Sequence, residues 1–580
     1  MMNVVLAGKS VKVSDADLLG EGGEARVFRH GNSALKIFHA ATDEKLQKLA
    51  QFPVGLPAEV ISPLAPVSDA RGRVIGYQMP LVAGAQDFSR LASRKSRPPL
   101  GAVTKLFATL HDVVRALHSL KVIVGDFNDG NALYVGTTPH LIDADSLQFG
   151  GFPCSVGHER FLDPRLYGVD LTRAPKFTEG SDWYAFSVLL FQSLLSVHPF
   201  GGTHTKLATM LRRAEARHSV MRSDVLLPRM ATPSKVLPDD LLHWFHAVFE
   251  KDERQVFPER LLQLPWTKCA CGTEHARSVC PECNALGPLV TRQVLRSRGR
   301  CTARTAFETS GRILVAAQQG GLRYLAEEHG TLRREDGTII STTLSGSHLV
   351  AALAGSVTWL ADADGRVEKW QGDRLVERAH TTTRNAWPSL AASTGATWRQ
   401  EQSWLIEHNS GARVGQVLEG QTWLWAGDRL GFGFYRAGGL TVAFLLRVGK
   451  SGLKQVDGIT WAGRIIDAST VFDARNALLT VVCDENGRDV VHRWLVDEHG
   501  TLIAQSHGGP RGNAAVLNGR VVVATDAGLV ALRAAAGHLI EAMQFPDSQP
   551  FVSAGDELLP NSDGSLFVVG ARDITQLTLS

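Results

Sequence analysis

Three oxygen-bearing side chains stand close together in one part of the chain and could hold a magnesium ion. Asp126 lies five residues before Asn131 in Val122-Ile-Val-Gly-Asp-Phe-Asn-Asp-Gly-Asn131, and Asp143 ends the apolar pair Leu141-Ile142. Phosphoryl transfer needs one carboxylate beside the attacking hydroxyl, plus an amide oxygen and a second carboxylate that hold Mg²⁺ against the phosphates. The spacing predicts that Asp126 is catalytic and that Asn131 and Asp143 bind Mg²⁺, although such residues also favour ordinary turns.

A glycine-rich turn and a strand with a central lysine lie upstream of these residues. The turn is Gly20-Glu-Gly-Gly-Glu-Ala-Arg-Val27, and backbone amides could approach phosphates closely where Cβ is absent, at Gly20, Gly22 and Gly23. The Lys36 ammonium stands between apolar neighbours in the strand that follows, where it needs an anionic partner. The two features predict a phosphate-binding site, although the turn could also be a plain hairpin.

Taken in order, these motifs resemble those of eukaryotic-type protein kinases of bacteria. The glycine turn resembles G-x-G-x-x-G-x-V, with Ala25 at the last glycine, and Ala34-Leu-Lys-Ile-Phe38 resembles V-A-I-K. The stretch around Asp126 resembles H-R-D-x-x-x-x-N, and Leu141-Ile-Asp-Ala-Asp-Ser146 resembles D-F-G with its flanks.

Two later landmarks add to the resemblance. Ser181-Asp-Trp-Tyr-Ala-Phe186 looks like the start of a buried kinase helix, and His198-Pro-Phe200 looks like the motif that follows it. By resemblance, Asp182 supports the catalytic loop by accepting hydrogen bonds from its backbone amides. The fold expected for residues 1–262 is therefore the α+β bilobal protein-kinase fold, with lobes at about 1–82 and 83–262.

The resemblance also implies a nucleotide site. Lys36 would pair with the α- and β-phosphates and with a glutamate on the next helix, for which Glu44 is the best candidate. Glu44 could instead be a solvated residue that pairs with Lys48 four positions later. The expected ATP-binding residues are Gly20, Gly22, Gly23, Val27, Lys36, Glu44, Met79 and Leu81, with Mg²⁺, or Mn²⁺ in its place, at Asn131 and Asp143.

The sequence departs from the kinase pattern at several positions. Val124-Gly125 replaces His-Arg, which removes the usual docking point for an activation-segment phosphate, and Asn128 replaces a phosphate-contacting lysine. Ala144-Asp145 replaces Phe-Gly, and Arg165 stands where A-P-E has its glutamate, so the usual ion pair to a later arginine cannot form in the same way. All the metal-binding and phosphate-binding roles nevertheless keep an occupant.

Four clustered cysteines are the most specific metal signal in the chain. Cys269-Ala-Cys271 and Cys280-Pro-Glu-Cys283 are separated by eight residues. Two such knuckles supply four thiolates to a tetrahedral Zn²⁺ ion. We expect a closed structural zinc site in a small ribbon at residues 263–290, with His275 as a spare residue. The remaining cysteines are expected to be small buried apolar residues: Cys154, Cys301 and Cys483.

Short apolar or alternating runs separated by Gly, Asn and Asp fill the chain from about residue 298. Their turns recur at intervals of roughly 35 to 46 residues, which is the size of one four-stranded propeller blade. The spacing predicts an all-β propeller, with seven blades, at residues 298–580. A β-sandwich or two smaller sheets is the alternative. A propeller would serve most simply as a platform for binding proteins.

The composition is that of an ordinary soluble, multidomain protein. The chain has 580 residues, 44% of them hydrophobic and 21% charged, and a net charge of +3, which gives no reason to expect a nucleic acid or a membrane as partner. No signal peptide or bilayer-spanning run is visible, so we expect a cytoplasmic protein. The clustering of four of the seven cysteines agrees with a reducing compartment.

The domain order is similar to that of bacterial kinases that occur together with a PP2C-type phosphatase and a von Willebrand A-domain protein. That resemblance implies ATP- and Mg²⁺-dependent phosphorylation of Ser or Thr on a protein substrate, which the propeller helps to recruit. The von Willebrand A-domain protein is a candidate substrate, and the phosphatase is the expected antagonist. Two other functions stay open, a nucleotide-binding pseudokinase scaffold and a small-molecule phosphotransferase.

Overall fold

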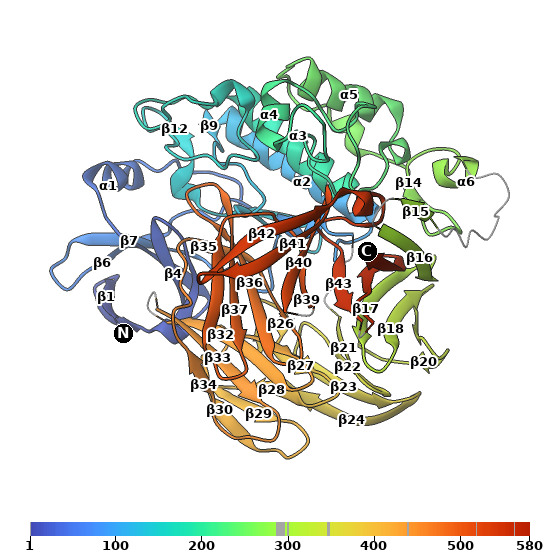
Figure 1. Cartoon of the computed structure of the whole chain (residues 1–580). Helices are drawn as coiled ribbons and strands as arrows, with labels where there is room; N and C mark the ends of the chain where they lie inside the picture. Colours follow the sequence, from blue (N-terminus) through green and yellow to red (C-terminus); the bar gives the residue numbers. More distant parts are fainter. Residues whose placement is uncertain are drawn as a thin grey trace.

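The computed structural model describes residues 2–94, 96–285, 296–298, 301–344, 349–437, 440–517, 519–561 and 563–579. Figure 1 shows an N-terminal sheet, a helical lobe and a large C-terminal region of strands that lies below the helices and beside the N-terminal sheet. The predicted boundary between ribbon and propeller falls partly on residues 286–295 and 299–300, which lie outside the described residues.

The N-terminal sheet has seven strands in the order β2-β1-β6-β7-β5-β4-β3. Alternating apolar residues such as Val4, Phe28 and Leu35 form its buried face. One helix, α1 (Asp43–Ala50), follows β5, and the Thr42 side chain caps it by accepting from Lys45 N. The strands are β1 (Met2–Leu6), β2 (Lys9–Val13), β3 (Leu18–Glu21), β4 (Ala25–His30), β5 (Ser33–Phe38), β6 (Ala65–Ser68) and β7 (Val74–Pro80).

The helical lobe is built around one almost fully buried helix. α3 (Glu179–Leu195) is apolar on nearly all sides, and it packs with α2 and α5 in a single large core. The other helices are α2 (Leu100–Ser119), α4 (Met210–Glu215) and α5 (Asp239–Glu250). β8 (Gln86–Asp87) precedes α2 and pairs with β10. The other short strands carry the loops between α2 and α3: β9 (Val122–Ile123), β10 (Ala132–Val135), β11 (Thr138–Leu141) and β12 (Gln148–Phe149).

The cysteine-rich segment is a small unit packed against the helical lobe. It contains β13 (Thr267–Lys268), β14 (Glu274–His275) and α6 (Pro281–Ala285), and the two strands pair antiparallel. Ala276 N donates to the carbonyl of Val236, 2.9 Å away, which ties the segment to the lobe.

The C-terminal region, residues 301–579, is hereafter the β domain. It consists of successive four-stranded antiparallel units, two of which join through one bridge between Gln505 and His538. β16 from the start of the domain pairs with β45 at its end, so the last unit contains both ends of the domain. The strands of the seven units are β17 (Arg312–Gln318), β18 (Leu322–Glu328), β19 (Thr331–Arg334) and β20 (Ile339–Ile340); β21 (Val350–Ala354), β22 (Val357–Ala361), β23 (Arg366–Gln371) and β24 (Arg374–His380); β27 (Leu390–Ala392), β28 (Thr397–Glu401), β29 (Trp404–Glu407) and β30 (Arg413–Gln416); β31 (Trp423–Ala426), β32 (Leu430–Ala437), β33 (Leu440–Arg447) and β34 (Lys454–Val456); β35 (Arg464–Phe472), β36 (Asn476–Asp484), β37 (Asp489–Asp497) and β38 (Leu502–His507); β39 (Ala514–Leu517), β40 (Arg520–Thr525), β41 (Gly528–Ala535) and β42 (His538–Phe545); and β43 (Glu557–Pro560), β44 (Leu566–Val569), β45 (Asp573–Leu579) and β16 (Cys301–Glu308).

Three short strands lie outside these units. β15 (Arg296–Arg298) extends the last unit beside β16, and β25 (Thr383–Arg384) pairs with β26 (Trp387–Pro388). Across the described ranges, no helix combines the length and the apolar character needed to span a bilayer.

Candidate functional site

The Lys36 ammonium lies against two carboxylates that come from far along the chain. Lys36 sits on β5 with 5% of its surface exposed, and its Nζ contacts Oδ1 of Asp143, 107 residues later, and Oδ1 of Asp145 at 2.5 Å. Tyr77 stands opposite Lys36 on β7 and donates its hydroxyl to the same Asp145 oxygen at 2.6 Å. A buried lysine is thereby paired twice, which removes most of the cost of burying its charge.

The charges of Lys36, Asp143 and Asp145 act strongly on one another. Burial disfavours the ammonium, but Asp143 and Asp145 together hold the pKa of Lys36 well above its usual value. Burial would also raise the pKa of Asp145, yet the Lys36 charge and the hydrogen bonds of Lys36 and Tyr77 lower it. The pKa of Asp143 is raised by burial, a shift that Lys36 opposes and the charges of Asp145 and Asp126 reinforce. Asp143 is also the more exposed of the two carboxylates, with 35% of its side-chain surface exposed against 14% for Asp145.

Asp143 adopts a backbone conformation that few non-glycine residues take. Its φ of 64° and ψ of 39° lie in the left-handed region. The short 3-10 segment Ala144–Ser146 follows directly, and Ser146 donates both its N–H and its hydroxyl to the Asp143 carbonyl, at 2.9 and 2.8 Å. Unusual backbone held by such hydrogen bonds is common where a side chain must point at a reacting group. Here it places two carboxylates, two positions apart, on one ammonium.

The loop that contains Asp126 is held by its own side chains. Asn128 is buried, donates to Asp126 Oδ1 at 2.9 Å and accepts from Gly130 N and Asn131 N through its own oxygen. Asn131 Nδ2 donates to Asp126 Oδ2 at 2.9 Å, and His158 N donates to Oδ1 at 2.9 Å. Asn128 thus fixes the Asp126 carboxylate, a role that the sequence alone did not suggest for it.

The two halves of the site lie side by side. Ile142 N donates to the carbonyl of Asn131 at 2.9 Å, so the residue before Asp143 is hydrogen-bonded to the end of the Asp126 loop. The structure therefore brings together Lys36, Asp126, Asn131 and Asp143, and it adds Asp145 to them.

Asp182 supports this loop from below. Its side chain is fully buried, and its oxygens accept from Val124 N at 2.8 Å, Gly125 N at 3.0 Å and the His118 ring at 2.9 Å. Asp182 lies in the first turn of α3, so the helix positions the carboxylate under two amides of the loop. This is the geometry expected of Asp182 from its sequence context.

An apolar cluster that includes Tyr77, the residue paired with Lys36 across β5 and β7, packs on the N-terminal sheet. Met79 is buried in it together with Tyr77, and Val27, Leu81 and Ile142 pack against its edge. Residues from the glycine turn, from the end of β7 and from the strand before Asp143 thus share one apolar wall. Such a wall beside charged groups suits the flat, apolar faces of a nucleobase.

The glycines of the β3–β4 turn have space above them. A Cβ on Gly20 or Gly22 would meet no atom within 4 Å, and none of the three glycines has a positive φ. Packing and backbone conformation therefore do not require glycine at these positions. A ligand that must come close to the backbone amides would require it.

Glu44 does not pair with Lys36. It lies exposed in the first turn of α1, where an acidic residue is favoured by the helix dipole, and it makes no ion pair among the described residues. Glu44 was the expected acidic partner of Lys36. Asp143 and Asp145 pair with Lys36 instead. The alternative pairing of Glu44 with Lys48 is absent as well, because Lys48 Nζ donates to the Pro153 carbonyl.

Arg165 stands where the A-P-E motif has a glutamate, but a nearby aspartate forms an ion pair with a later arginine. Asp163, two residues earlier, accepts two hydrogen bonds from Arg254, at 2.6 and 2.9 Å, and both side chains are buried. Arg165 pairs with Asp252 at 3.1 Å. The segment that ends near residue 165 is thereby anchored to the helical lobe.

The four cysteine sulfurs lie close enough together to hold one metal ion. Sγ of Cys269 lies 3.6 Å from Sγ of Cys283, Sγ of Cys271 lies 3.7 Å from Sγ of Cys280, and all four sulfurs lie within 4.8 Å of one another. Sulfurs about 2.3 Å from one Zn²⁺ ion would lie about 3.8 Å apart. The set therefore fits zinc, and His275 is not part of it.

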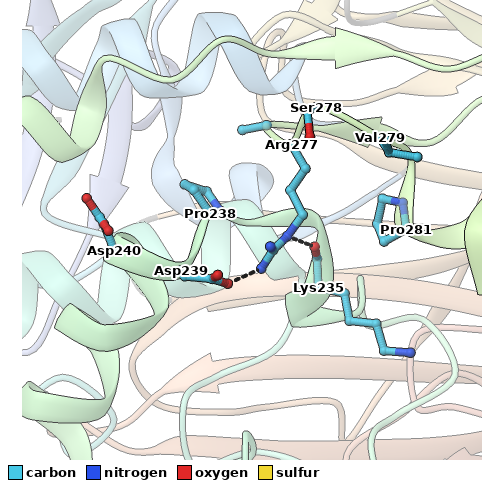
Figure 2. Close-up of a pocket in the computed structure, with 9 residues that line it drawn as sticks. Lys235, Pro238, Asp239, Asp240, Arg277, Ser278, Val279 and Pro281 are labelled. Carbon is cyan, nitrogen blue, oxygen red and sulfur yellow. Dashed lines mark hydrogen bonds and ion pairs between the residues drawn. The ribbon is translucent and has the colours of Figure 1, made fainter.

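An open groove lies between this cysteine segment and the helical lobe, away from Lys36. It has a volume of about 830 Å³, and Arg277 spans it, donating to the Lys235 carbonyl and to Asp239 at 2.6 Å (Figure 2). Its walls carry Asp240, Val279 and Pro281 among others. The ion pair joins the two walls and holds the segment in place.

Sequence reasoning missed several residues of the site. Tyr77 and Asn128 act through hydrogen bonds to carboxylates that strand register and loop geometry alone determine. His158 reaches Asp126 through its backbone, so its residue type gives no signal. The sequence did offer Asp145 as a possible assistant to Asp143, but it could not show their shared partner.

Comparison with known proteins gives likenesses to solved structures alone. No family model matches the chain, and no curated protein matches it. Among solved structures, the chain is similar to the autoinhibited serine kinase domain of the giant muscle protein titin, with 12% identity and a TM-score of 0.34 over 45% of this chain and 78% of that one. A likeness at this TM-score supports no conclusion about function. The proposed function therefore rests on the geometry of the site.

Proposed function

We propose that residues 2–262 form a protein-kinase-like unit that binds ATP with Mg²⁺ and transfers a phosphoryl group to a serine or threonine of a protein. The observation that carries the proposal is the convergence of Lys36, Asp143 and the Asp126–Asn131 loop, which are remote in sequence, beside one apolar wall. One cation and several oxygen donors at one place are what phosphoryl transfer requires.

The donor set fits magnesium. Asn131 offers an amide oxygen and Asp143 and Asp145 offer carboxylates, the hard oxygen ligands that Mg²⁺ prefers. Bound Mg²⁺ would neutralise phosphate charge and orient the phosphoryl group. Lys36 is buried and fully charged, so it can hold a phosphate oxygen at the cost of part of its contact with Asp143.

Asp126 is placed to receive the acceptor hydroxyl. Its Oδ1 accepts from Asn128 and His158, whereas its Oδ2 accepts from Asn131 alone and keeps a lone pair for an incoming hydroxyl. Three fixed hydrogen bonds orient the carboxylate before the substrate arrives, which lowers the entropic cost of reaching a reactive geometry. Asp182 maintains this orientation through Val124 and Gly125.

The other two parts of the chain have supporting roles in this proposal. The four-cysteine segment holds a structural Zn²⁺ ion, and the β domain is a seven-bladed propeller that helps to recruit the protein substrate. A von Willebrand A-domain protein is the proposed substrate, with a PP2C-type phosphatase as antagonist, in the cytoplasm. The repeated four-stranded units and the β16–β45 pairing support the propeller assignment.

The test uses the full chain, γ-labelled ATP and Mg²⁺, with casein as a general protein acceptor. Wild type should label the protein acceptor or itself, and Asp126→Asn should lower the rate by about 10²-fold or more, the usual scale for a general base. Asp112→Asn, an exposed substitution on α2, is the matched control and should keep the wild-type rate.

Three results would contradict the proposal. Equal labelling by wild type and Asp126→Asn would remove Asp126 from the reaction. Nucleotide binding without transfer would favour a pseudokinase scaffold. Transfer only to small molecules such as amino sugars would favour the phosphotransferase alternative.

A further inference from the structure

One turn of the β domain reaches into the candidate site. β36 and β37 are joined by Glu485-Asn-Gly-Arg488, and the carbonyl of Gly487 accepts from Glu159 N at 3.0 Å. Arg488 Nε pairs with the Glu159 carboxylate at 3.1 Å. The segment it contacts, 157–160, is the one whose His158 N–H holds the carboxylate of Asp126.

The same face of the β domain meets the other loops that border the site. A Cβ built on Gly23, in the glycine turn, would lie 3.8 Å from the amide oxygen of Asn486. A Cβ built on Gly130, beside Asn131, would overlap the guanidinium of Arg464, which begins β35. The glycine turn, the Asp126 loop and the 157–160 segment are thus all bordered by residues 464 and 484–489.

Asp489 anchors the turn by charge. Its carboxylate is 12% exposed and lies 3.1 Å from Arg160 Nη1 and 3.4 Å from His158 Nε2, and it also contacts Arg511 of the β domain. Burial would raise the pKa of Asp489, but the His158 hydrogen bond and the Arg160 and Arg511 charges hold it well below the usual value. The carboxylate therefore stays charged throughout the physiological pH range.

The tip of the turn is shaped for close approach. Asn486 has a φ of 55° and Gly487 a φ of 78°, as in the Asn-Gly turns that suit a tight hairpin. A Cβ on Gly487 would lie 2.8 Å from the carbonyl oxygen of Gly157, closer than packing allows. Glycine is required at this position both by its conformation and by its contact with the 157–160 segment.

We propose that residues 484–489 form a gate that closes the acceptor side of the site, with Asn486 at its tip reaching the edge of the glycine turn. The inference rests on the proposed function, because it describes how the same site is regulated. The turn contacts the segment beside Asp126, past which a protein segment would have to bring its hydroxyl. Lys36 pairs with Asp143 and Asp145, and Asp145 accepts a hydrogen bond from Tyr77; among the described residues, no ion pair joins these groups to the turn. A protein acceptor gains access when the turn leaves the 157–160 segment.

The same contact holds the 157–160 segment in its closed position without phosphorylation. The sequence has Val124-Gly125 where kinases carry the arginine that binds an activation-segment phosphate. Here a carboxylate of the β domain binds Arg160 and His158 of the segment. The position of the β domain, rather than phosphorylation of the 157–160 segment, therefore controls access to the site.

The experiment replaces Arg488 by glutamate in the full chain, which sets two like charges against each other at Glu159. Arg488 is 75% exposed, so the substitution should leave folding intact. Arg475→Glu, in the exposed turn at the other end of β36, is the matched control. A second variant, Asp489→Asn, weakens the same contact from its other side.

With casein as acceptor, Arg488→Glu and Asp489→Asn should each raise the transfer rate about five-fold, the effect expected from losing one partly exposed ion pair. The KM for ATP should stay at the wild-type value, and Arg475→Glu should match wild type in both quantities. A rate that is unchanged or lower in both release variants, while wild type transfers phosphate, would overturn the gate alone. Absence of transfer in every protein would reject the proposed function together with the gate.

Discussion

Replacing Asp182 by alanine should loosen the Asp126 loop more than any other single change outside the site itself. The carboxylate is fully buried and accepts three hydrogen bonds, two from loop amides and one from His118. Alanine would leave Val124 N, Gly125 N and the imidazole without their acceptor. These donors lie too deep for water to replace the carboxylate fully.

The size of the effect follows from removing a buried charged group rather than from adding up its three hydrogen bonds. A hydrogen bond to a charged group contributes about 1.5–3 kcal/mol, and removing one partner of a buried charged pair costs about 3–5 kcal/mol in total once relaxation is included. We therefore expect Asp182→Ala to cost about 3–5 kcal/mol locally. That cost corresponds to an increase of at least about 10²-fold in the opening of the loop, because 1.4 kcal/mol is tenfold.

Hydrogen exchange measured by mass spectrometry on peptides that cover residues 118–131 gives the local readout. Protection at Val124 and Gly125 should fall by about 10²-fold or more, and the transfer rate should fall with it. Glu179→Gln, an exposed change in the same first turn of α3, should leave both unchanged. Unaltered exchange at Val124 and Gly125 in Asp182→Ala would refute the account of this carboxylate.

Three further predictions concern other parts of the chain. Asp145→Asn should lower kcat/KM for ATP about ten-fold or more because Lys36 loses a charged partner, whereas Glu44→Gln should leave kcat/KM unchanged. Equal effects of the two substitutions would contradict the assignment of Asp145, and not Glu44, as the partner of Lys36. Burial and the Arg160 charge lower the pKa of His198 to about 3, so the folded protein favours the neutral ring. The free energy of unfolding should therefore fall by about 1.4 kcal/mol per pH unit as the pH drops from about 6.5 towards 3. Urea unfolding at pH 7 and pH 5 checks this slope, and a His198→Asn variant with the same slope would contradict it. Cys280→Ser should abolish stoichiometric zinc in elemental analysis, and full zinc content in that variant would exclude the four-cysteine site.

Much of the site could be predicted from the sequence because its residues stand in short motifs. Asp126 and Asn131 lie in one loop, so their spacing alone indicates that they meet. The Asp182 contacts were expected from the resemblance of Ser181-Asp-Trp183 to the start of a buried kinase helix. The four cysteines needed only the geometry of two tight turns.

The partner of Lys36 could not be predicted in the same way. Glu44 has the right residue type on the right helix, but α1 is short, it has no buried residue, and it leaves Glu44 in solvent. The actual partner depends on the left-handed backbone of Asp143, which turns two carboxylates towards one ammonium. No local sequence signal states that an aspartate will adopt this conformation.

The contacts between distant parts of the chain could not be predicted from the sequence either. Asp489 looks like an ordinary residue after an Asn-Gly turn, and only the packing of the β domain brings it to Arg160. Asp163 replaced the missing glutamate partner of Arg254 from a position two residues away. In the β domain, the spacing of turns indicated four-stranded units, while the pairing of β16 with β45 depends on residues nearly the whole domain apart.

The central claim is that Lys36 and Asp143 jointly hold a magnesium nucleotide. Isothermal titration of the full chain with the non-hydrolysable analogue AMP-PNP, with and without Mg²⁺, tests it most directly. The account predicts Mg²⁺-dependent binding by wild type and by the exposed control Lys105→Met, and an affinity lower by about ten-fold or more in Lys36→Met and Asp143→Asn. Equal affinity in all four proteins, or no binding by any of them, would contradict it.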